Sequence, residues 1–278
     1  MASAQNRETA SPTVRLVAHV AKMARIRKKL TQEQLGKMIG YSAAAISAME
    51  SCAQPPSDDM LMKLEEVLGD GMGIFEQARL YMRMEAYPPQ FKGYAPLEQA
   101  SLGLQLYAPQ VVHGLFQTER YARALIGGGY PPLPEARVNQ LVEARMARKT
   151  LFDRDPVPLI EVILEETVLT RTIGSEDIMR EQRRYLVDCA QRRNVTLHVL
   201  PLEAGKFGEY AGDQGSLNVL ETPEHERLVY LEPQDESLLI TDPPKVSMYG
   251  HLYAKIRSQT LGPRESPDLI MRLAGVEV

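Results

Sequence analysis

The sequence predicts two domains of different fold class: an all-α N-terminal domain, then a mixed α/β (α+β) C-terminal domain with about five strands. Over the first 90 residues, apolar side chains recur at helical spacing in five segments, which glycine, proline and capping residues separate. Short runs of aliphatic and β-branched residues appear only later in the chain, mixed with helical segments. The pair Pro88-Pro89 lies between the two patterns and marks the predicted boundary.

The N-terminal helices follow from local signals. Val17, Val20, Ala21 and Ala24 give the first helix an apolar stripe. The second is predicted to start at a capping box beginning with Thr31, to bury Leu35, Met38 and Ile39, and to stop at Gly40. Ser42 and Ser57 are placed to cap the third and fourth helices, and the fifth spans about 74–87. The predicted organisation is a disordered tail (1–12), a helix-turn-helix domain (13–70), a connecting helix (71–90) and an effector domain (91–278).

The later chain alternates between helical and extended patterns, which predicts helices packed around one sheet. The strand order is not predictable from the sequence. The expected strands are 158–164, 195–200, 216–220, 227–232 and 237–240, and the expected helices are 97–106, 118–126, 135–152, 176–193, 245–260 and 267–273.

The composition predicts a cytoplasmic protein. Its 278 residues are 44% hydrophobic and 24% charged, which is ordinary for a soluble protein. There is no apolar run long enough to cross a membrane, and the first eleven residues lack the apolar core of a secretory signal. The two cysteines, Cys52 and Cys189, are far apart in the sequence and are expected to be free thiols.

The charge of the chain is distributed unevenly. The net charge is −4, yet residues 15–37 carry seven basic residues and one acidic residue. From residue 71 onward there are 28 acidic and 23 basic residues. Because attraction to phosphate is local and screened over roughly 8 Å, a basic segment on an acidic body favours a small DNA-binding module. A solvated helix face would explain the charge of this segment equally well.

The stretch from Arg25 to Ser57 has the spacing of a helix-turn-helix. Gly40-Tyr41-Ser42 is a three-residue turn between two predicted helices, and Gly40 tolerates a positive φ there. Gly36 lies inside the first of these helices, where glycine costs about 1 kcal/mol relative to alanine. We therefore expect the next helix to cross closely at Gly36, with Ile46 as its packing partner.

These residues resemble the Xre or lambda-repressor-like helix-turn-helix family. The matching pattern is Arg25, Thr31-Gln32, Gly36, the Gly40–Ser42 turn, and Ile46-Ser47 followed by Glu50. The resemblance implies a structural ion pair between Arg25 and Glu50. It also implies a homodimer on double-stranded DNA. Its DNA-binding positions fall on Gln32, Lys37, Ser42, Ala43, Ala44 and Ser47.

The predicted recognition helix departs from the usual pattern of this family. It offers no Arg, Lys, Asn or Gln, the side chains that make bidentate contacts to guanine or adenine. Alanines can contact thymine methyl groups, and serines can hydrogen-bond in either direction. We therefore expect weak direct readout, with phosphate contacts, dimer spacing and DNA shape contributing more to binding.

The C-terminal part also resembles a known type of domain. The run from Val111 to Leu125 is similar to the "VPGLLQT" signature of an uncharacterised actinobacterial domain, with His113 where proline is usual. Similar runs follow at 143–148, 163–169, 199–201 and 229–232. Proteins of this architecture include WhiJ-like developmental regulators, described as antitoxin-like and often encoded beside a small partner protein. The resemblance thus implies transcription regulation with a small protein partner.

No pattern in the sequence predicts an enzyme, a cofactor or a metal site. The five histidines lack metal-ligand spacing, and Cys52 has no nearby cysteine. Glu165-Glu166 is better explained as the start of a helix than as a catalytic pair. Gly127-Gly128-Gly129 lacks the Lys-Ser/Thr of a phosphate loop.

Two hypotheses stay open for the C-terminal domain. Either it binds a small protein partner, or it senses a small molecule in a pocket under the glycine-rich segment 205–215. This segment contains Phe207 and Tyr210, which are candidates for contacting a ligand or partner. It fits a lid over a ligand cleft, but it fits an ordinary connection between strands slightly better. An enclosed cavity with converging polar groups would favour the sensor, and an exposed apolar groove the partner module.

Overall fold

The computed structural model describes residues 10–86, 91–206, 208–233 and 236–275. Its contacts divide the chain into two compact units, residues 1–86 and 87–278, and each is described by itself. The Pro88-Pro89 pair and Phe207 lie outside the described residues, as do residues 1–9 of the predicted tail. No described helix is both long and apolar enough to cross a membrane.

The N-terminal unit is all helical, as the sequence predicts. Side-chain caps begin four of its helices: Ser11, Thr31, Ser42 and Ser57 each accept a hydrogen bond from a backbone N–H three residues ahead. The described helices are α2 (Pro12–Arg27), α3 (Gln32–Ile39), α4 (Ala43–Glu50), α5 (Asp58–Leu68) and α6 (Ile74–Ala86).

The core of this unit draws on all five helices. Leu35, Ile46 and Leu64 are fully buried at its centre, and Phe75 and Ala78 bring α6 into the same cluster. The helix expected as a connector therefore packs as part of the N-terminal unit. The prediction that Met38 is buried is wrong, because its side chain is 58% exposed. Over the eight residues of α3, Leu35 and Ile39 are enough to meet the core.

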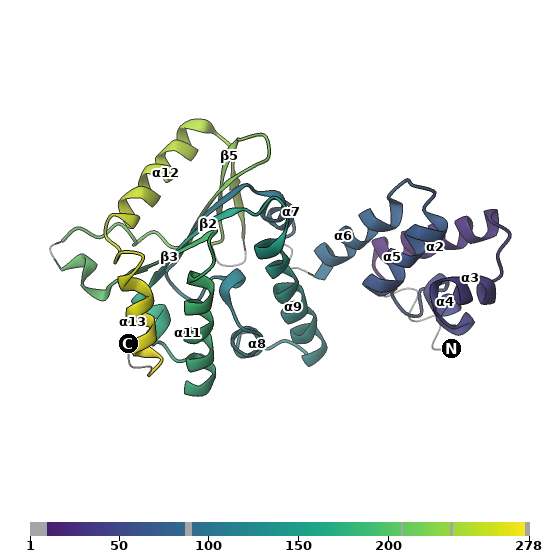
Figure 1. Cartoon of the computed structure of the whole chain (residues 1–278), viewed down its shortest axis with the longest axis horizontal. Helices are drawn as coiled ribbons and strands as arrows, with labels where there is room; N and C mark the ends of the chain where they lie inside the picture. Colours follow the sequence, from purple (N-terminus) through teal and green to yellow (C-terminus); the bar gives the residue numbers. More distant parts are fainter. Residues whose placement is uncertain (1–9, 87–90, 207, 234–235, 276–278) are drawn as a thin grey trace. The chain divides into compact units, whose positions relative to one another are not determined.

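The C-terminal unit is built on a six-stranded mixed sheet with the order β3-β2-β1-β4-β5-β6 (Figure 1). Strands β3, β2 and β1 run parallel, whereas β4 pairs antiparallel with β1, and β5 and β6 continue antiparallel. The strands are β1 (Gly103–Ala108), β2 (Leu159–Glu165), β3 (Val195–Leu200), β4 (Leu217–Glu221), β5 (Arg227–Leu231) and β6 (Leu238–Ile240).

The expected helix over 97–106 is wrong in its second half. Helix α7 (Tyr94–Ala100) ends early, and Gly103–Ala108 forms β1 between β2 and β4. Leu104 and Leu106 are buried on one face of β1, and Tyr107 is buried on the other. Leu104 and Leu106 alternate with Gly103 and Gln105, which is the period of a strand and does not fit the expected helix.

Helices cover both faces of the sheet. Figure 1 shows α12 (Pro243–Arg257) on one face, with α9 (Glu135–Ala147), α11 (Glu176–Ala190) and α13 (Glu265–Leu273) on the other. Helix α8 (Glu119–Gly127) packs on α9 and α11. The remaining short elements are α10 (Glu166–Thr170) and the 3-10 turns η2 (Gly114–Phe116), η3 (Arg148–Asp153) and η4 (Leu202–Gly205).

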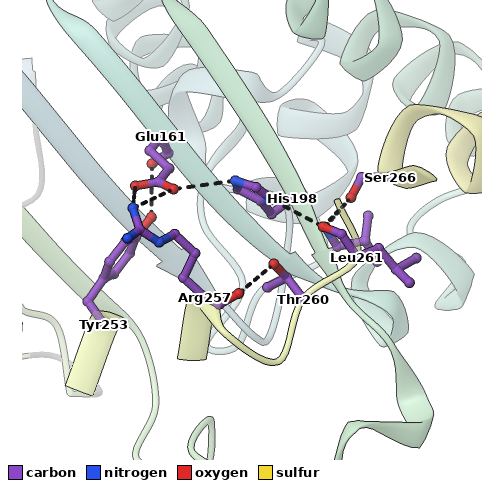
Figure 2. Close-up of polar contacts among 8 residues, drawn as sticks. Glu161, His198, Tyr253, Arg257, Thr260, Leu261 and Ser266 are labelled. Carbon is purple, nitrogen blue, oxygen red and sulfur yellow. Dashed lines mark hydrogen bonds and ion pairs between the residues drawn. The ribbon is translucent and has the colours of Figure 1, made fainter. Parts of the chain in front are cut away.

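A histidine joins the sheet to the connection between α12 and α13 (Figure 2). In His198, Nε2 lies 3.3 Å from Oε1 of Glu161, and Nδ1 lies 3.1 Å from the carbonyl oxygen of Leu261. Both partners are acceptors, so only the doubly protonated ring donates to both. The hydrogen bond with Glu161 raises the pKa of His198, against the opposing effect of burial. Arg257, 3.4 Å from both Glu161 carboxylate oxygens, completes the group.

We predict that this contact stabilises the C-terminal unit in a pH-dependent way. Because the folded state raises the pKa of His198, the stabilisation is fully present below the unfolded pKa of about 6.5 and is lost as pH rises through the folded pKa. The melting temperatures of the wild type and of His198→Gln should differ most near about pH 6 and least near about pH 9. His251→Gln, at an exposed position on α12, is the control. A difference that stays constant with pH would contradict the prediction.

Candidate DNA-binding surface and effector cavity

The turn between α3 and α4 has the geometry that its sequence predicts. Thr31 and Gln34 form a reciprocal capping box at the start of α3, with hydrogen bonds of 3.1 and 2.8 Å. Gly40 ends α3 at φ +73°, a conformation that L side chains rarely adopt. Ser42 then caps α4, since its hydroxyl oxygen accepts from the backbone N–H of Ala45 at 3.1 Å. The two helices are therefore fixed by local bonds on both sides of the turn.

Gly36 allows this turn to fold back closely onto α3. A Cβ atom at Gly36 would lie 2.5 Å from the carbonyl oxygen of Tyr41, which is too close for any side chain. The backbone N–H of Tyr41 donates to the Gly36 carbonyl oxygen at 2.8 Å. The expected partner, Ile46, is instead part of the buried core. The close approach at Gly36 is thus to the backbone of the turn and not to a side chain of α4.

One face of α4 is exposed and carries only small side chains. Ser42, Ala43, Ala44 and Ser47 are all exposed, whereas Ile46 and Met49 on the opposite face are buried. The Ser42 hydroxyl is already used as the cap of α4. The outer face therefore offers methyl groups and the Ser47 hydroxyl.

Arg25, Gln32 and Glu50 form one connected group that ties α2, α3 and α4 together. Arg25 donates to both carboxylate oxygens of Glu50, at 2.5 and 2.9 Å, and to the carbonyl oxygen of Leu30 at 2.7 Å. Gln32 donates its amide to Glu50 at 2.9 Å. Burial alone would raise the pKa of Glu50, but the bonds from Arg25 and Gln32 lower it. The amide expected to contact phosphate is thus engaged inside the protein in this structure.

The basic residues expected near the phosphates fall into two groups. Arg27 and Lys28 both pair with Asp70 beyond the end of α5. Lys37 pairs only with Glu33 one turn earlier on α3, at 2.9 Å, and both side chains are largely exposed. Lys29 is also exposed. An exposed pair of this kind contributes little to stability, so Lys37 is readily available to another anion.

The C-terminal unit holds a cavity of about 760 Å³ at the carboxyl end of β1. Its walls come from the segment after β1, from the segment leading into β4 and from α9, so residues far apart in the sequence meet there. Valine and leucine side chains supply the apolar part of the wall. The lining includes Ala108, Val111, Val112, His113, Gln117, Leu125, Leu141, Arg145, Arg148, Ser216, Asn218, Leu231 and Glu232.

The two arginines of this cavity have different partners. Arg148 makes a buried bidentate pair with Glu98, at 2.8 and 2.7 Å, and lies over the ring of Phe91. Arg145 donates to the amide oxygen of Gln117 at 3.0 Å. Burial, together with the nearby charge of Arg148, lowers the pKa of Arg145 to about 10. The cavity wall thus carries one arginine with a bound carboxylate and one bound to a neutral amide.

The glycine-rich segment is fastened to the sheet rather than standing free above it. The hydroxyl of Tyr210 donates to the Glu165 carboxylate at the end of β2, which also lies 2.5 Å from the hydroxyl of Tyr107. Gly212 has no room for a side chain, because a Cβ there would lie 2.2 Å from the Tyr107 hydroxyl oxygen. The last two residues of the segment and the residue after it, 214–216, form part of the cavity wall.

Two family comparisons agree with this geometry. Residues 91–272 match the family described as a domain of unknown function (DUF5753), and residues 22–69 match a helix-turn-helix family. The chain belongs to the DUF5753 family. The helix-turn-helix match supports a DNA-binding transcription regulator, which agrees with the Xre-like pattern in the N-terminal unit. No curated protein and no solved structure matches the chain.

The arginine pair of the DUF5753 domain was not predicted as a site. Arg145 and Arg148 lie in the run 143–148, which we noted only as part of the family resemblance. Their spacing of three residues was the available signal, since it places both on one side of a helical turn. Glu98, the buried partner of Arg148, is 50 residues away in the sequence, so only the fold brings the three together. The described residues hold no cluster of His, Cys, Asp and Glu able to bind a metal ion.

We predict that Arg25→Ala destabilises the N-terminal unit by about 3 kcal/mol, because it leaves a buried carboxylate without its charged partner. The Arg25 side chain is only 11% exposed and that of Glu50 only 3%. Lys63→Ala, which removes an exposed pair with Asp59, is the matched control and should have a much smaller effect. Denaturant unfolding of the full chain measures both. Equal losses in the two variants would mean that the Arg25–Glu50 pair is energetically a surface pair.

Proposed function

We propose that the protein is a sequence-specific transcription regulator, and not an enzyme, that binds duplex DNA as a homodimer. In this proposal each copy places α4 in the major groove, and the protein is associated with the nucleoid. The observation that carries it is the exposed face of α4, with Ala43, Ala44 and Ser47 held outward by a turn whose close approach and positive φ are possible because of Gly36 and Gly40. A face without long or charged side chains can approach the base edges closely.

The affinity in this proposal comes mainly from phosphate contacts. The small side chains of α4 can contact thymine methyl groups and form single hydrogen bonds, which discriminate weakly between bases. Lys37 and Lys29 are the exposed cations that we assign to phosphates. Gln32 would contact phosphate after its amide has left Glu50, because that amide donates to Glu50 in this structure. Sequence specificity then depends on the spacing of the two half-sites and on DNA shape.

For the DUF5753 domain we propose that it senses a small molecule. The supporting observation is the cavity of about 760 Å³, whose size falls within the usual range for ligand sites. It lies beyond the carboxyl end of β1, where the chain first turns toward β2 and later returns to the other side of β1 as β4. Ligand sites in α/β sheets concentrate where strand order reverses in this way.

A small protein partner, as in WhiJ-like and antitoxin-like regulators, is the second candidate. It is favoured by the edge strand β6, where Leu238 and Leu239 are 49% and 45% exposed. An exposed apolar edge strand is a template for pairing with another chain. Leu239→Lys should block such a partner while leaving the sensing cavity intact, because Leu239 does not line it. Co-purification of the wild type, but not of this variant, with a small neighbouring protein would favour this candidate.

Footprinting of DNA fragments selected from genomic DNA tests the DNA-binding proposal. We expect a protected near-palindrome with half-site centres separated by about 34 Å, one helical turn, because each copy would insert one α4 helix. Failure of the full chain to retain any fragment over random competitor DNA would contradict the proposal.

On the selected fragment, we predict that Lys37→Ala and Ser47→Ala have different effects. Loss of one phosphate contact at Lys37 should weaken binding similarly on all sequences and reduce the slope of log affinity against log salt by about 0.9. Ser47→Ala should weaken the free energy of DNA binding by less than the roughly 1–3 kcal/mol that a bidentate base contact contributes. A larger loss at Ser47→Ala, confined to one operator position, would show that α4 reads bases more strongly than we propose.

A further inference from the structure

The chemistry of the DUF5753 cavity indicates which ligand it fits. Its lining carries three charged side chains: Arg145, the exposed Glu232, and Arg148, which is paired with Glu98. The guanidinium of Arg145 has the neutral amide of Gln117 as its hydrogen-bond partner, and among the described residues no carboxylate lies within ion-pair distance of it. Glu98 and Glu232 affect its pKa only through space, and Glu98 is already held by Arg148. A half-buried cation whose only hydrogen-bond partner among the described residues is an amide keeps donors free for a bound anion.

The other polar groups near Arg145 favour a ligand with acceptor oxygens. The amide of Gln117 is used at both ends, because its nitrogen donates to the carbonyl oxygen of Val112 at 2.6 Å. In His113, Nδ1 accepts from the backbone N–H of Leu115 at 3.4 Å, which places the proton of the neutral ring on Nε2. Burial and the two arginines lower the pKa of His113 well below its usual range, so the ring is neutral. Arg145 and His113 therefore both have N–H groups that can donate to a ligand.

The rest of the wall limits the charge and defines the shape of the ligand. Val112, Leu125 and Leu141 line the cavity and require an apolar body. Glu98 neutralises Arg148, so Arg145 is the one lining cation without a carboxylate at ion-pair distance among the described residues, and Glu232 adds a negative charge to the wall. This balance suits a monoanion better than a doubly charged phosphate. Asn218 is buried in the lining, and its Oδ1 has no hydrogen-bond partner among the described residues. It can accept from a hydroxyl or N–H group of the ligand.

We propose that the cavity binds a small organic carboxylate, with its carboxylate on Arg145 and His113 and its apolar body against Val112, Leu125 and Leu141. The biological role of this site rests on the sensing function proposed above, but binding itself does not require DNA. Arg145 is thus a ligand-binding residue, whereas Arg148 is a structural one.

Matched acids and amides test the proposal on the full chain without DNA. The probes are hexanoate and phenylacetate, each compared with hexanamide or phenylacetamide, which have the same shape and no charge. We expect both acids to raise the melting temperature of the wild type in a concentration-dependent way and the amides to leave it unchanged. In Arg145→Met the effect of the acids should disappear. If neither acid stabilises the wild type more than its amide, or if the effect persists in Arg145→Met, the proposal is wrong.

Unfolding without ligand distinguishes a binding arginine from a structural one. Arg145→Met should melt only slightly below the wild type, because it removes no ion pair and loses a single hydrogen bond, the one to the buried amide of Gln117. Arg148→Met should melt well below it, because Glu98 is then left buried and unpaired. Equal destabilisation by the two variants would overturn the assignment of Arg145.

A DNA-binding assay with the same probes separates this proposal from the proposed regulation. Stabilisation by the acids with unchanged DNA affinity would leave the carboxylate site standing and contradict the sensing function. Normal DNA binding by a wild-type chain that no acid stabilises would contradict the carboxylate site alone.

Discussion

Strand β1 pairs in parallel with β2 on one side and antiparallel with β4 on the other, and the architecture of the DUF5753 domain depends on this double pairing. A parallel neighbour requires a crossover, and α8 and α9 supply it between β1 and β2. The antiparallel neighbour comes from a later part of the chain. The segments that leave β1 and enter β4 therefore separate at the same end of the sheet, and the cavity lies between them. Because Leu104, Leu106 and Tyr107 bury β1 on both faces, this end is held in place by the core.

Each of the two domains contains a buried ion pair, and the DUF5753 domain also contains an arginine without such a pair. In the N-terminal unit, Arg25 and Glu50 neutralise each other and fix the position of α4, so the exposed face of that helix is rigid. Glu98 and Arg148 do the same beside the cavity. Arg145 is the exception among these groups, since it is half-buried and the described residues offer it a neutral amide instead of a carboxylate. Residues kept in such a setting are characteristic of binding sites, where a ligand completes the interaction.

The parts of the structure that local signals determine could be predicted from the sequence. Thr31, Gly40 and Ser42 act within three residues of their own position, which is why the helix-turn-helix and its caps were predicted correctly. Strand β1 was missed although Leu102, Leu104 and Leu106 alternate with Gly103 and Gln105, which is the period of a strand. The alternation is short and ends at Tyr107 and Ala108, which are both buried, and it directly follows a helix. The prediction of the partner of Gly36 was wrong because the contact is to a backbone carbonyl oxygen. Every residue type has this group, so the sequence does not show the contact. The cavity joins His113, Arg145 and Asn218, and only the fold brings them together.

The central claim is that the small, exposed face of α4 contacts DNA, and a pair of substitutions at Ala44 tests it most directly. Ala44 is exposed, so neither Glu nor Arg at this position disturbs the core. DNA affinity of the full chain should be measured on one selected fragment at one salt concentration, since charge effects depend on salt. We predict that Ala44→Glu weakens binding by at least about 100-fold, because it brings a negative charge against the groove, and that Ala44→Arg does not weaken it. Equal, wild-type affinity of both variants would contradict the account, because α4 would then lie away from the DNA.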